Sequence, residues 1–282
     1  DNVKVVSQNS CDDGMDIVSC KNVSVENSFF RTKDDCIAIK AGVTYGGVAY
    51  FEKRADNSVD NVSIKNCVLW NDIWGNALEI GFETRGDEIK NIVYENIDVI
   101  NALGTWGNEG VLTIHNGDRA KVSNVLYKDI RVEEAEGHIV NILVLNSKYS
   151  KDKKRGSVSG VRFENIRAES SKPLKIKLGG FDENSVVENI VFKNFTINSK
   201  PLKFEDIPQS NFVRVVKIRD AAKIQIKNMR LKKTKGYNWR FFKAGGAYQP
   251  LIERGSDIAA VGELDMKLWA ALSCPTRGLY FD

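Results

Sequence analysis

The chain has few of the residues that build metal and redox centres. Its 282 residues include two histidines, His115 and His138, which argues against a histidine-rich metal site. The five cysteines contain no C-x-x-C pair, and their odd number leaves at least one unpaired. We expect the cysteines mainly as small core residues. The sequence leaves open whether one disulfide forms among the first four, Cys11, Cys20, Cys36 and Cys67. No metal and no cofactor is predicted.

Long apolar runs and strong charge are also missing. No stretch of 18 apolar residues occurs, so no transmembrane helix is predicted, and no signal peptide is visible. A net charge of +4 is too small to indicate nucleic-acid binding by itself. Apolar residues make up 42% of the chain, as in ordinary globular proteins. Because the chain opens inside a repeat at Asp1–Val3, we expect N-terminal coils to be missing from it.

A short repeated pattern runs through most of the chain. It consists of a polar residue, usually asparagine, then an aliphatic, any residue, an aliphatic or aromatic, and often asparagine or aspartate two residues later. The copies begin at Asn2, Asn22, Asn61, Asn91, Asn124, Gly160 and Asn189, with a weaker one at Lys223. Repeats of 20–40 residues indicate a solenoid, and alternation of apolar residues within each copy indicates strands.

The repeat predicts an all-β fold, a right-handed parallel β-helix. A second apolar stretch follows most copies, as at Cys36–Ile39 and Ala77–Ile80, so each coil has at least two short strands. Turn residues of this kind are expected to bond between stacked coils: Asn27, Asn66, Asn96, Asn165 and Asn194. We assign the β-helix to residues 1–234. Residues 235–282 break the pattern and are expected to form an irregular C-terminal cap with a short helix over 257–272.

Uneven repeat steps indicate insertions, which in solenoids often collect on the binding face. The largest lies between residues 42 and 60, and a second spans 102–110 and carries Trp106. Tyr45 and Tyr50 in the first are candidates for lining a binding site. The basic stretch 148–155 is expected to be a solvated loop.

Two acidic clusters lie one short coil apart. Asp13 belongs to Asp12–Asp16, and 21 residues later come Asp34 and Asp35. Stacked coils are about 4.8 Å apart, so these carboxylates are expected to lie within several ångströms of each other on one solvent-exposed face. Like charges held that close raise at least one pKa, and glycoside hydrolysis needs one protonated and one ionised carboxyl. The alternative is calcium binding or simple turn acids.

The segments Asp13–Asp16 and Asp34–Lys40, with Asn22-Val23 and Phe29-Phe30 between them, resemble glycoside hydrolase family 28, the polygalacturonases. That family carries Asn-Thr-Asp-Gly-x-Asp and, one coil later, Asp-Asp-x-Ile-Ala-x-Lys. The resemblance implies that Asp34 is the general acid. It implies that Asp13 and Asp35 position and activate a water molecule, and that the anomeric configuration is inverted.

Two further family motifs are altered. Where the family has Gly-His-Gly, this chain has Gly75-Asn76-Ala77, so Asn76 replaces the histidine. The Arg-Ile-Lys motif that binds the galacturonate carboxylate is replaced by Leu112–Asn116. This loss favours a neutral or branched glycan over plain polygalacturonate. The stretch from Val68 to Arg85 also resembles family 49, the dextranases, which act on neutral α-glucans with a similar fold and three aspartates.

Further candidates for substrate binding lie on and near these coils: Asn76, Glu79, His115, Lys40, Arg85 and Trp74. Glu79 is expected to face outward and to bind sugar hydroxyls or act as an additional acid, or else to be a solvated strand residue. His115 is expected to hydrogen-bond a sugar or to tune an aspartate, or else to be a structural histidine. Lys40 and Arg85 are expected to hold substrate or to lower the pKa of the base, or else to form surface ion pairs. Trp74 is expected to stack on a sugar ring.

Three functions fit these observations. The favoured one is an inverting glycoside hydrolase with a polysaccharide or oligosaccharide substrate and no nucleic-acid partner. The alternatives are a calcium-assisted polysaccharide lyase and a non-catalytic carbohydrate-binding β-helix. An extracellular or periplasmic location follows only from the place where such polymers occur. The oligomeric state stays open.

Overall fold

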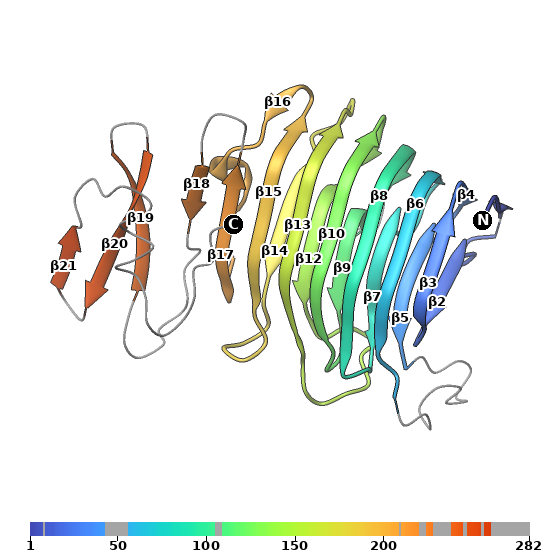
Figure 1. Cartoon of the computed structure of the whole chain (residues 1–282), viewed down its shortest axis with the longest axis horizontal. Helices are drawn as coiled ribbons and strands as arrows, with labels where there is room; N and C mark the ends of the chain where they lie inside the picture. Colours follow the sequence, from blue (N-terminus) through green and yellow to red (C-terminus); the bar gives the residue numbers. More distant parts are fainter. Residues whose placement is uncertain are drawn as a thin grey trace.

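The computed structural model describes residues 1–7, 9–42, 56–104, 109–208 and 210–219, and the strand backbone at 224–227, 238–244, 247–254 and 257–260. The regular secondary structure of the described residues is β-strand, apart from one short 3₁₀ turn at Phe204–Asp206. They contain no helix that could span a membrane. Coils stack along one axis from the N-terminus, as Figure 1 shows. This confirms the predicted right-handed parallel β-helix.

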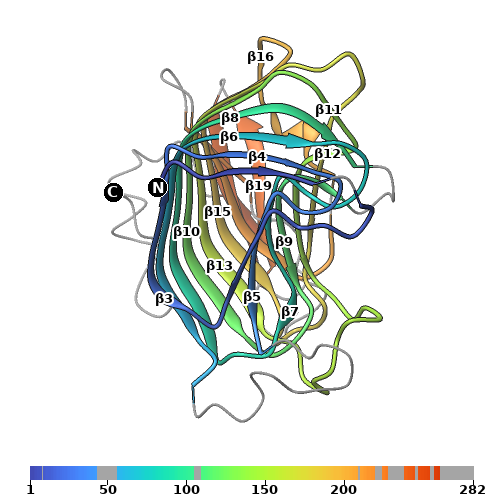
Figure 2. The ribbon, with the colours of Figure 1, turned by 90° about the vertical axis from the view of Figure 1, so that its right-hand side faces the viewer.

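Two parallel sheets form the walls of the β-helix, and Figure 2 shows their strands one behind another along the axis. The longer sheet contains β1 (Lys4–Val6), β3 (Lys21–Glu26), β4 (Phe29–Thr32), β6 (Val59–Asn71), β8 (Glu88–Leu103), β10 (Lys121–Val132), β11 (Ala135–Glu136), β13 (Ser157–Ala168), β15 (Val187–Ile197), β16 (Lys200–Pro201), β17 (Val213–Arg219) and β18 (Ile224–Lys227). The shorter sheet contains β2 (Met15–Val18), β5 (Ile37–Ala41), β7 (Leu78–Thr84), β9 (Gly110–Asn116), β12 (His138–Val144) and β14 (Lys175–Gly179).

The asparagines of the repeat bend the long strands. Two columns of residues have φ between 51° and 59°, the left-handed conformation that asparagine tolerates better than most residues. Their side chains bond between coils, for example Asn61 Nδ2 to Asn22 Oδ1 at 2.8 Å and Asn96 Nδ2 to Asn66 Oδ1 at 2.8 Å. The predicted structural role of these turn residues is therefore confirmed.

Matching register stacks like residues inside the β-helix. The rings of Tyr94, Tyr127, Phe163 and Phe192 form one continuous stack, with neighbouring centroids 4.7, 4.9 and 5.0 Å apart. On the shorter sheet, Ile39, Ile80, Ile114 and Ile142 occupy equivalent positions and are fully buried. Each added coil therefore covers the apolar surface of the preceding coil, which fixes the spacing and register of both sheets.

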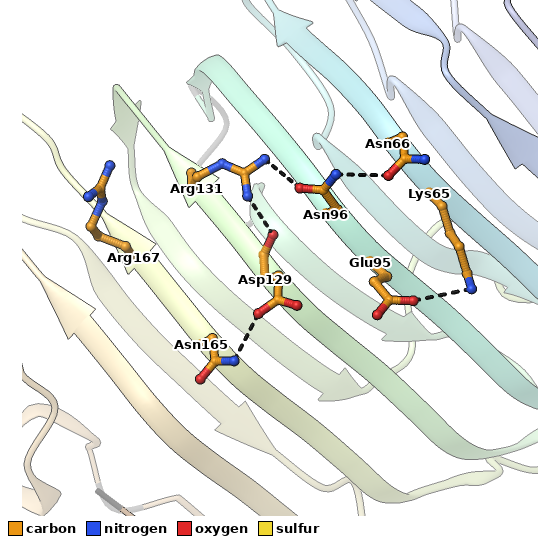
Figure 3. A pocket seen from close by; sticks show the side chains of 8 residues that line it. All are labelled: Lys65, Asn66, Glu95, Asn96, Asp129, Arg131, Asn165 and Arg167. Atoms are coloured by element: carbon orange, nitrogen blue, oxygen red, sulfur yellow. Dashed lines mark hydrogen bonds and ion pairs between the residues drawn. The ribbon is translucent and has the colours of Figure 1, made fainter. Parts of the chain in front are cut away.

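A row of alternating charges crosses the outer face of the longer sheet. The row contains Glu26, Lys65, Glu95, Lys128, Glu164 and Lys193, each on a separate strand. Neighbours pair, with Lys128 Nζ 2.6 Å from Glu95 Oε1. Figure 3 shows a hollow beside this row, where Arg131 bonds to Asn96 and Asn165 bonds to Asp129. Because these side chains mainly tie coils together and lie away from the shorter sheet, we assign no substrate site there.

Two expectations about the C-terminal part of the chain are wrong. The weak repeat copy at Lys223 does not form a coil, because β18 pairs antiparallel with β17, and β17 itself is the coil strand. Residues 257–260 form strand β21, antiparallel to β20 (Ala247–Arg254), which in turn pairs with β19 (Asn238–Ala244). A helix beginning at residue 257 is therefore excluded. The domain boundary at residue 234 stays a prediction.

The first four cysteines are all free. Cys36 and Cys67 are buried as expected, but Cys11 and Cys20 are exposed, so the prediction of core positions holds for only half of these residues. No disulfide forms among the four.

Candidate active site

The structure brings the two acidic clusters together. Strands β2 and β5 pair in parallel with Met15 opposite Ile37, which places Asp13 opposite Asp35, 22 residues later, rather than opposite Asp34. The backbone N–H of Asp35 donates to Asp13 Oδ1 at 3.2 Å. One carboxylate oxygen from each of Asp13, Asp34 and Asp35 lies within 4.8 Å of the others. The predicted clustering of the three acids is therefore present, but Asp35 is buried, so the expectation that all three lie on a solvent-exposed face is wrong for Asp35.

Two glycines allow this close packing. A Cβ on Gly14 would lie 2.4 Å from the carbonyl oxygen of Cys36. Gly75 has φ of +68°, and a Cβ there would lie 2.4 Å from Asp34 Oδ1. The turn before Gly75 is held because Asn71 Nδ2 donates to the Asp34 carbonyl at 2.8 Å. Trp74, half-buried, belongs to this turn and so lies beside the acid cluster, where its sugar-stacking role stays a prediction.

Lys40 is the cation of the acid cluster. Its Nζ lies 2.8 Å from Asp13 Oδ2 and 2.9 Å from Asp16 Oδ1, and its side chain is 10% exposed. Burial alone would lower the pKa of Lys40, but the carboxylates of Asp13, Asp16 and Asp35 raise it instead. Lys40 is therefore a permanent positive charge, as expected for a residue that favours an ionised base.

The environments of the three acids differ. Burial raises the pKa of Asp13 to about 6, although the Lys40 ammonium partly offsets that effect. Burial also raises the pKa of half-buried Asp34, opposed by the backbone N–H of Asp35 and by Lys40. The pKa of Asp35 is raised well above its usual range by burial first, and then by the charges of Glu79 and Asp13. The cluster can therefore hold a proton under mildly acidic conditions, as a general acid requires.

Asn76 supports Asp35 instead of reaching solvent. Its backbone N–H and its Nδ2 both donate to Asp35 Oδ1, at 2.7 and 2.8 Å. Its Oδ1 accepts from the backbone N–H of Gly110 at 2.9 Å, so one side chain links two coils. With 2% of its surface exposed, Asn76 does not fit the predicted contact with substrate in this structure.

The expectation that Glu79 reaches solvent is wrong, and His115 fits the alternative interpretation as a structural histidine. Both side chains are completely buried. His115 Nδ1 lies 3.0 Å from each carboxylate oxygen of Glu79, and Thr113 Oγ1 also donates to Glu79. Asn141 Nδ2 lies 3.1 Å from His115 Nε2. Strand alternation predicts the side of the sheet on which a residue lies, but not whether other residues cover that side. These side chains form a buried polar cluster.

Arg85 is tied to the basic loop rather than to the aspartates. Its Nε lies 3.5 Å from Asp152 Oδ1, while Arg119 Nη1 lies 2.9 Å from Asp152 Oδ2. The buried Asp118 carboxylate accepts the backbone N–H groups of Lys151 and Asp152 at 2.7 and 2.8 Å. The loop at 148–155 is largely exposed, as expected, and is also anchored by these contacts. A role for Arg85 in substrate binding stays a prediction.

Three neighbouring residues were not among the site residues predicted from the sequence. Asp16 is the second carboxylate partner of Lys40. Phe82 and Glu83 lie on β7 directly opposite Lys40, where the pairing of β5 and β7 is irregular. Burial raises the pKa of Glu83, and Lys40 lowers it in part. The break in alternation after Ile80, at Gly81, was the available signal. Tyr45, Tyr50 and Trp106 lie outside the described residues.

The carboxylate oxygens of Asp13, Asp34 and Asp35 are close enough to be considered as cation ligands. However, the Lys40 ammonium already contacts Asp13 and Asp16 directly and offsets part of their charge. A lysine in that position replaces the charge that a metal ion would supply. The geometry therefore favours acid–base chemistry by the carboxyl groups, without assigning a metal site.

Fold and site together define a parallel β-helix protein with a lysine-linked carboxylate cluster, the kind of group that glycoside hydrolysis uses. The sequence profile of the family described as glycosyl hydrolases family 28 matches residues 2–211. The chain belongs to this family. The family profile does not support the similarity to family 49 that the sequence suggested.

The curated relatives carry polygalacturonase names. The chain is 29% identical over 173 residues to "Probable endopolygalacturonase D" of Neosartorya fischeri, covering 55% of this chain and 34% of that protein. It is 26% identical over 186 residues to "Polygalacturonase QRT2" of Arabidopsis thaliana, covering 58% of this chain and 34% of that protein. The chain thus spans about a third of the length of these relatives. No solved structure gives a significant match.

Proposed function

We propose that the protein is an inverting glycoside hydrolase that cleaves glycosidic bonds of a polysaccharide or oligosaccharide. The observation that carries the proposal is the convergence of Asp13, Asp34 and Asp35 within 4.8 Å. Membership of family 28 supports the same chemistry. Because such polymers are found outside the cytoplasm, the proposed location is extracellular or periplasmic.

In this mechanism Asp34 is the general acid. It is half-buried and its pKa is raised, so it retains a proton that it can give to the glycosidic oxygen as the bond breaks. Asp13 contacts Lys40 at 2.8 Å and, once ionised above its pKa of about 6, removes a proton from the attacking water. Asp35, fixed by both donors of Asn76, orients that water from the opposite side. Trp74, next to the Gly75 turn against Asp34, would stack on a sugar ring.

Inversion is inferred from the family and not from the spacing of the acids. Inverting enzymes usually separate their two carboxyl groups by about 6.5–9.5 Å, and retaining enzymes by about 5–5.5 Å. The closest oxygens here lie within 4.8 Å, nearer to the retaining range. Two acids sharing one water can reconcile this spacing with inversion, because neither of them needs to attack the sugar. The configuration of the product therefore tests the proposal independently of activity.

The first experiment is a screen of polysaccharides by reducing-end release, comparing the wild type with Asp34→Asn. The matched control is Asp87→Asn, because the Asp87 side chain is 80% exposed and pairs only with Arg119 among the described residues. We expect Asp34→Asn to lose activity while Asp87→Asn keeps it. Equal activity of both variants would remove Asp34 from the mechanism. Binding of a glycan without hydrolysis by the wild type would instead support a non-catalytic β-helix.

A further inference from the structure

A bulge in β7 pushes two side chains out beside the acid cluster. Ile39 of β5 pairs with Ile80, and Ala41 pairs with Thr84, so Gly81, Phe82 and Glu83 together oppose the single residue Lys40. Bulges of this kind turn side chains away from the regular alternation and are frequent next to active sites. Lys40 is bonded to Asp13, so the bulge lies directly alongside the proposed catalytic residues.

The Phe82 ring is partly exposed and is supported from below. It stacks on the buried His115 ring with centroids 4.5 Å apart and an angle of 6° between the planes. His115 is itself fixed between Glu79 and Asn141. Gly81 is required at this point, because a Cβ there would lie 2.1 Å from the His115 carbonyl oxygen. Phe82 is therefore a rigid, partly accessible aromatic surface, which suits the apolar C–H face of a sugar.

Glu83 supplies hydrogen-bond acceptors next to this ring. The carboxylate is partly buried and faces Lys40, Asp16 and Asp118. Among the described residues the structure assigns it no ion pair, and its one donor is its own backbone N–H. An ionised carboxylate can accept about four hydrogen bonds, so Glu83 has capacity for the hydroxyl groups of a ligand.

The region is rich in acidic side chains in the described part of the chain. Five carboxyl groups interact electrostatically with Lys40: those of Asp13, Asp16, Asp34, Asp35 and Glu83. Among the other described cations nearby, Arg85 is held by Asp152 and Lys148 Nζ lies 4.8 Å over the Tyr149 ring. Like charges brought together at a binding surface disfavour the wrong partner. Where Glu83 is ionised, a sugar carboxylate beside it would therefore be repelled, whereas an uncharged sugar would not.

We propose that Phe82 and Glu83 bind one uncharged sugar residue of the substrate next to the bond that is cleaved. The Phe82 ring packs against the C–H face of this sugar, and the Glu83 carboxylate accepts hydrogen bonds from its hydroxyls. This inference rests on the hydrolase function proposed above. It makes the bulge a determinant of specificity and names the substrate class as a glycan that is neutral at this position.

The test compares polygalacturonate with the same polymer after chemical reduction of its carboxyl groups, which changes charge but not linkage. Neutral galactans and glucans complete the substrate set. We expect the wild type to prefer the uncharged polymers. Phe82→Ala should raise KM on them roughly fivefold to tenfold with little change in kcat, the size expected for one aromatic contact. Phe82→Tyr should restore the wild-type KM.

Glu83→Gln gives a second, independent readout. It keeps one acceptor but removes a negative charge, so the ratio of kcat/KM on polygalacturonate to kcat/KM on the reduced polymer should rise. Controls are Phe181→Ala, an aromatic that is 46% exposed elsewhere, and Glu88→Gln, an exposed acid of the longer sheet. Thermal unfolding of every variant checks that the β-helix is intact.

The outcomes separate this inference from the hydrolase proposal. If the wild type prefers polygalacturonate, or if Phe82→Ala and Glu83→Gln leave KM and the substrate ratio unchanged, the inference is wrong even though Asp34→Asn is inactive. If no polymer is cleaved, the hydrolase proposal fails. Affinity electrophoresis in gels containing the reduced polymer then tests the bulge alone, and equal retardation of wild type and Phe82→Ala would overturn it.

Discussion

Replacing Lys40 by methionine should move the whole pH profile of activity to higher pH. Lys40 contacts Asp13 at 2.8 Å and Asp16 at 2.9 Å. Even with this cation present, burial holds the pKa of Asp13 at about 6. An opposite charge at such a distance typically lowers a carboxyl pKa by about 1–3 units. Without it, the pKa of Asp13 should rise by at least one unit, so the base is ionised only at higher pH.

Loss of Lys40 should also raise the pKa of the general acid, Asp34. Lys40 also lowers the pKa of Asp34, so its loss keeps Asp34 protonated to higher pH. Both limbs of the kcat/KM profile should therefore shift upward. The acid limb should lie above pH 7 in Lys40→Met, and at pH 5 the rate should fall at least about tenfold, because one pKa unit corresponds to about 1.4 kcal/mol.

The assay is reducing-end release from a cleaved polymer between pH 4 and 9. Lys40→Arg keeps the charge and should stay near the wild-type profile. Lys65→Met removes a lysine from the charge row of the longer sheet and should leave the profile unchanged. An acid limb of Lys40→Met that coincides with the wild type, in a folded protein, would refute the assignment of Asp13 as a base controlled by Lys40.

Three further variants test the packing of the site and the coils. Gly75→Ala should lose at least about tenfold in activity and about 1–3 kcal/mol of stability, because φ is +68° and the new Cβ would meet Asp34. Reducing-end assays measure the activity and urea unfolding measures the stability. Wild-type values for both would contradict this packing. Asn165→Ala should lower the free energy of unfolding by about 1–2 kcal/mol, because φ is +56°, while Asn165→Gly should cost less; equal losses would argue against backbone strain. Glu79→Ala should destabilise by about 1–3 kcal/mol, because it leaves the buried His115 ring without its hydrogen-bond partner at Nδ1. Thermal unfolding measures this loss, and an unchanged melting temperature would contradict a structural role for the pair.

The coil architecture could be predicted from the sequence because its determinants are local. Each coil needs asparagine at a left-handed turn and alternating apolar residues, and both are visible at Asn61 and Asn91. The last coil was missed because β17 lacks that pattern. The copy at Lys223 has it, but the chain pairs there in the antiparallel direction. Pattern alone cannot give the direction in which a strand returns.

The part of the candidate site that depends on the pairing of two neighbouring coils could be predicted from the sequence. Asp13 and Asp35 meet because β2 and β5 lie one coil apart in the sequence and pair in the shorter sheet. The burial of Glu79 and His115 was not predictable, because alternation gives the side of a strand but not what covers it. The bulge at Phe82 and Glu83 depends on a local slip of pairing against Lys40, which a repeat pattern does not reveal.

The most direct test of the three-aspartate mechanism is proton NMR of the first sugar released from a cleaved substrate, recorded before mutarotation. If Asp34 protonates the leaving oxygen while Asp13 and Asp35 activate a water on the opposite face, the new reducing end has the inverted configuration. A retained configuration would show that one of these carboxylates attacks the sugar itself, and would contradict the mechanism.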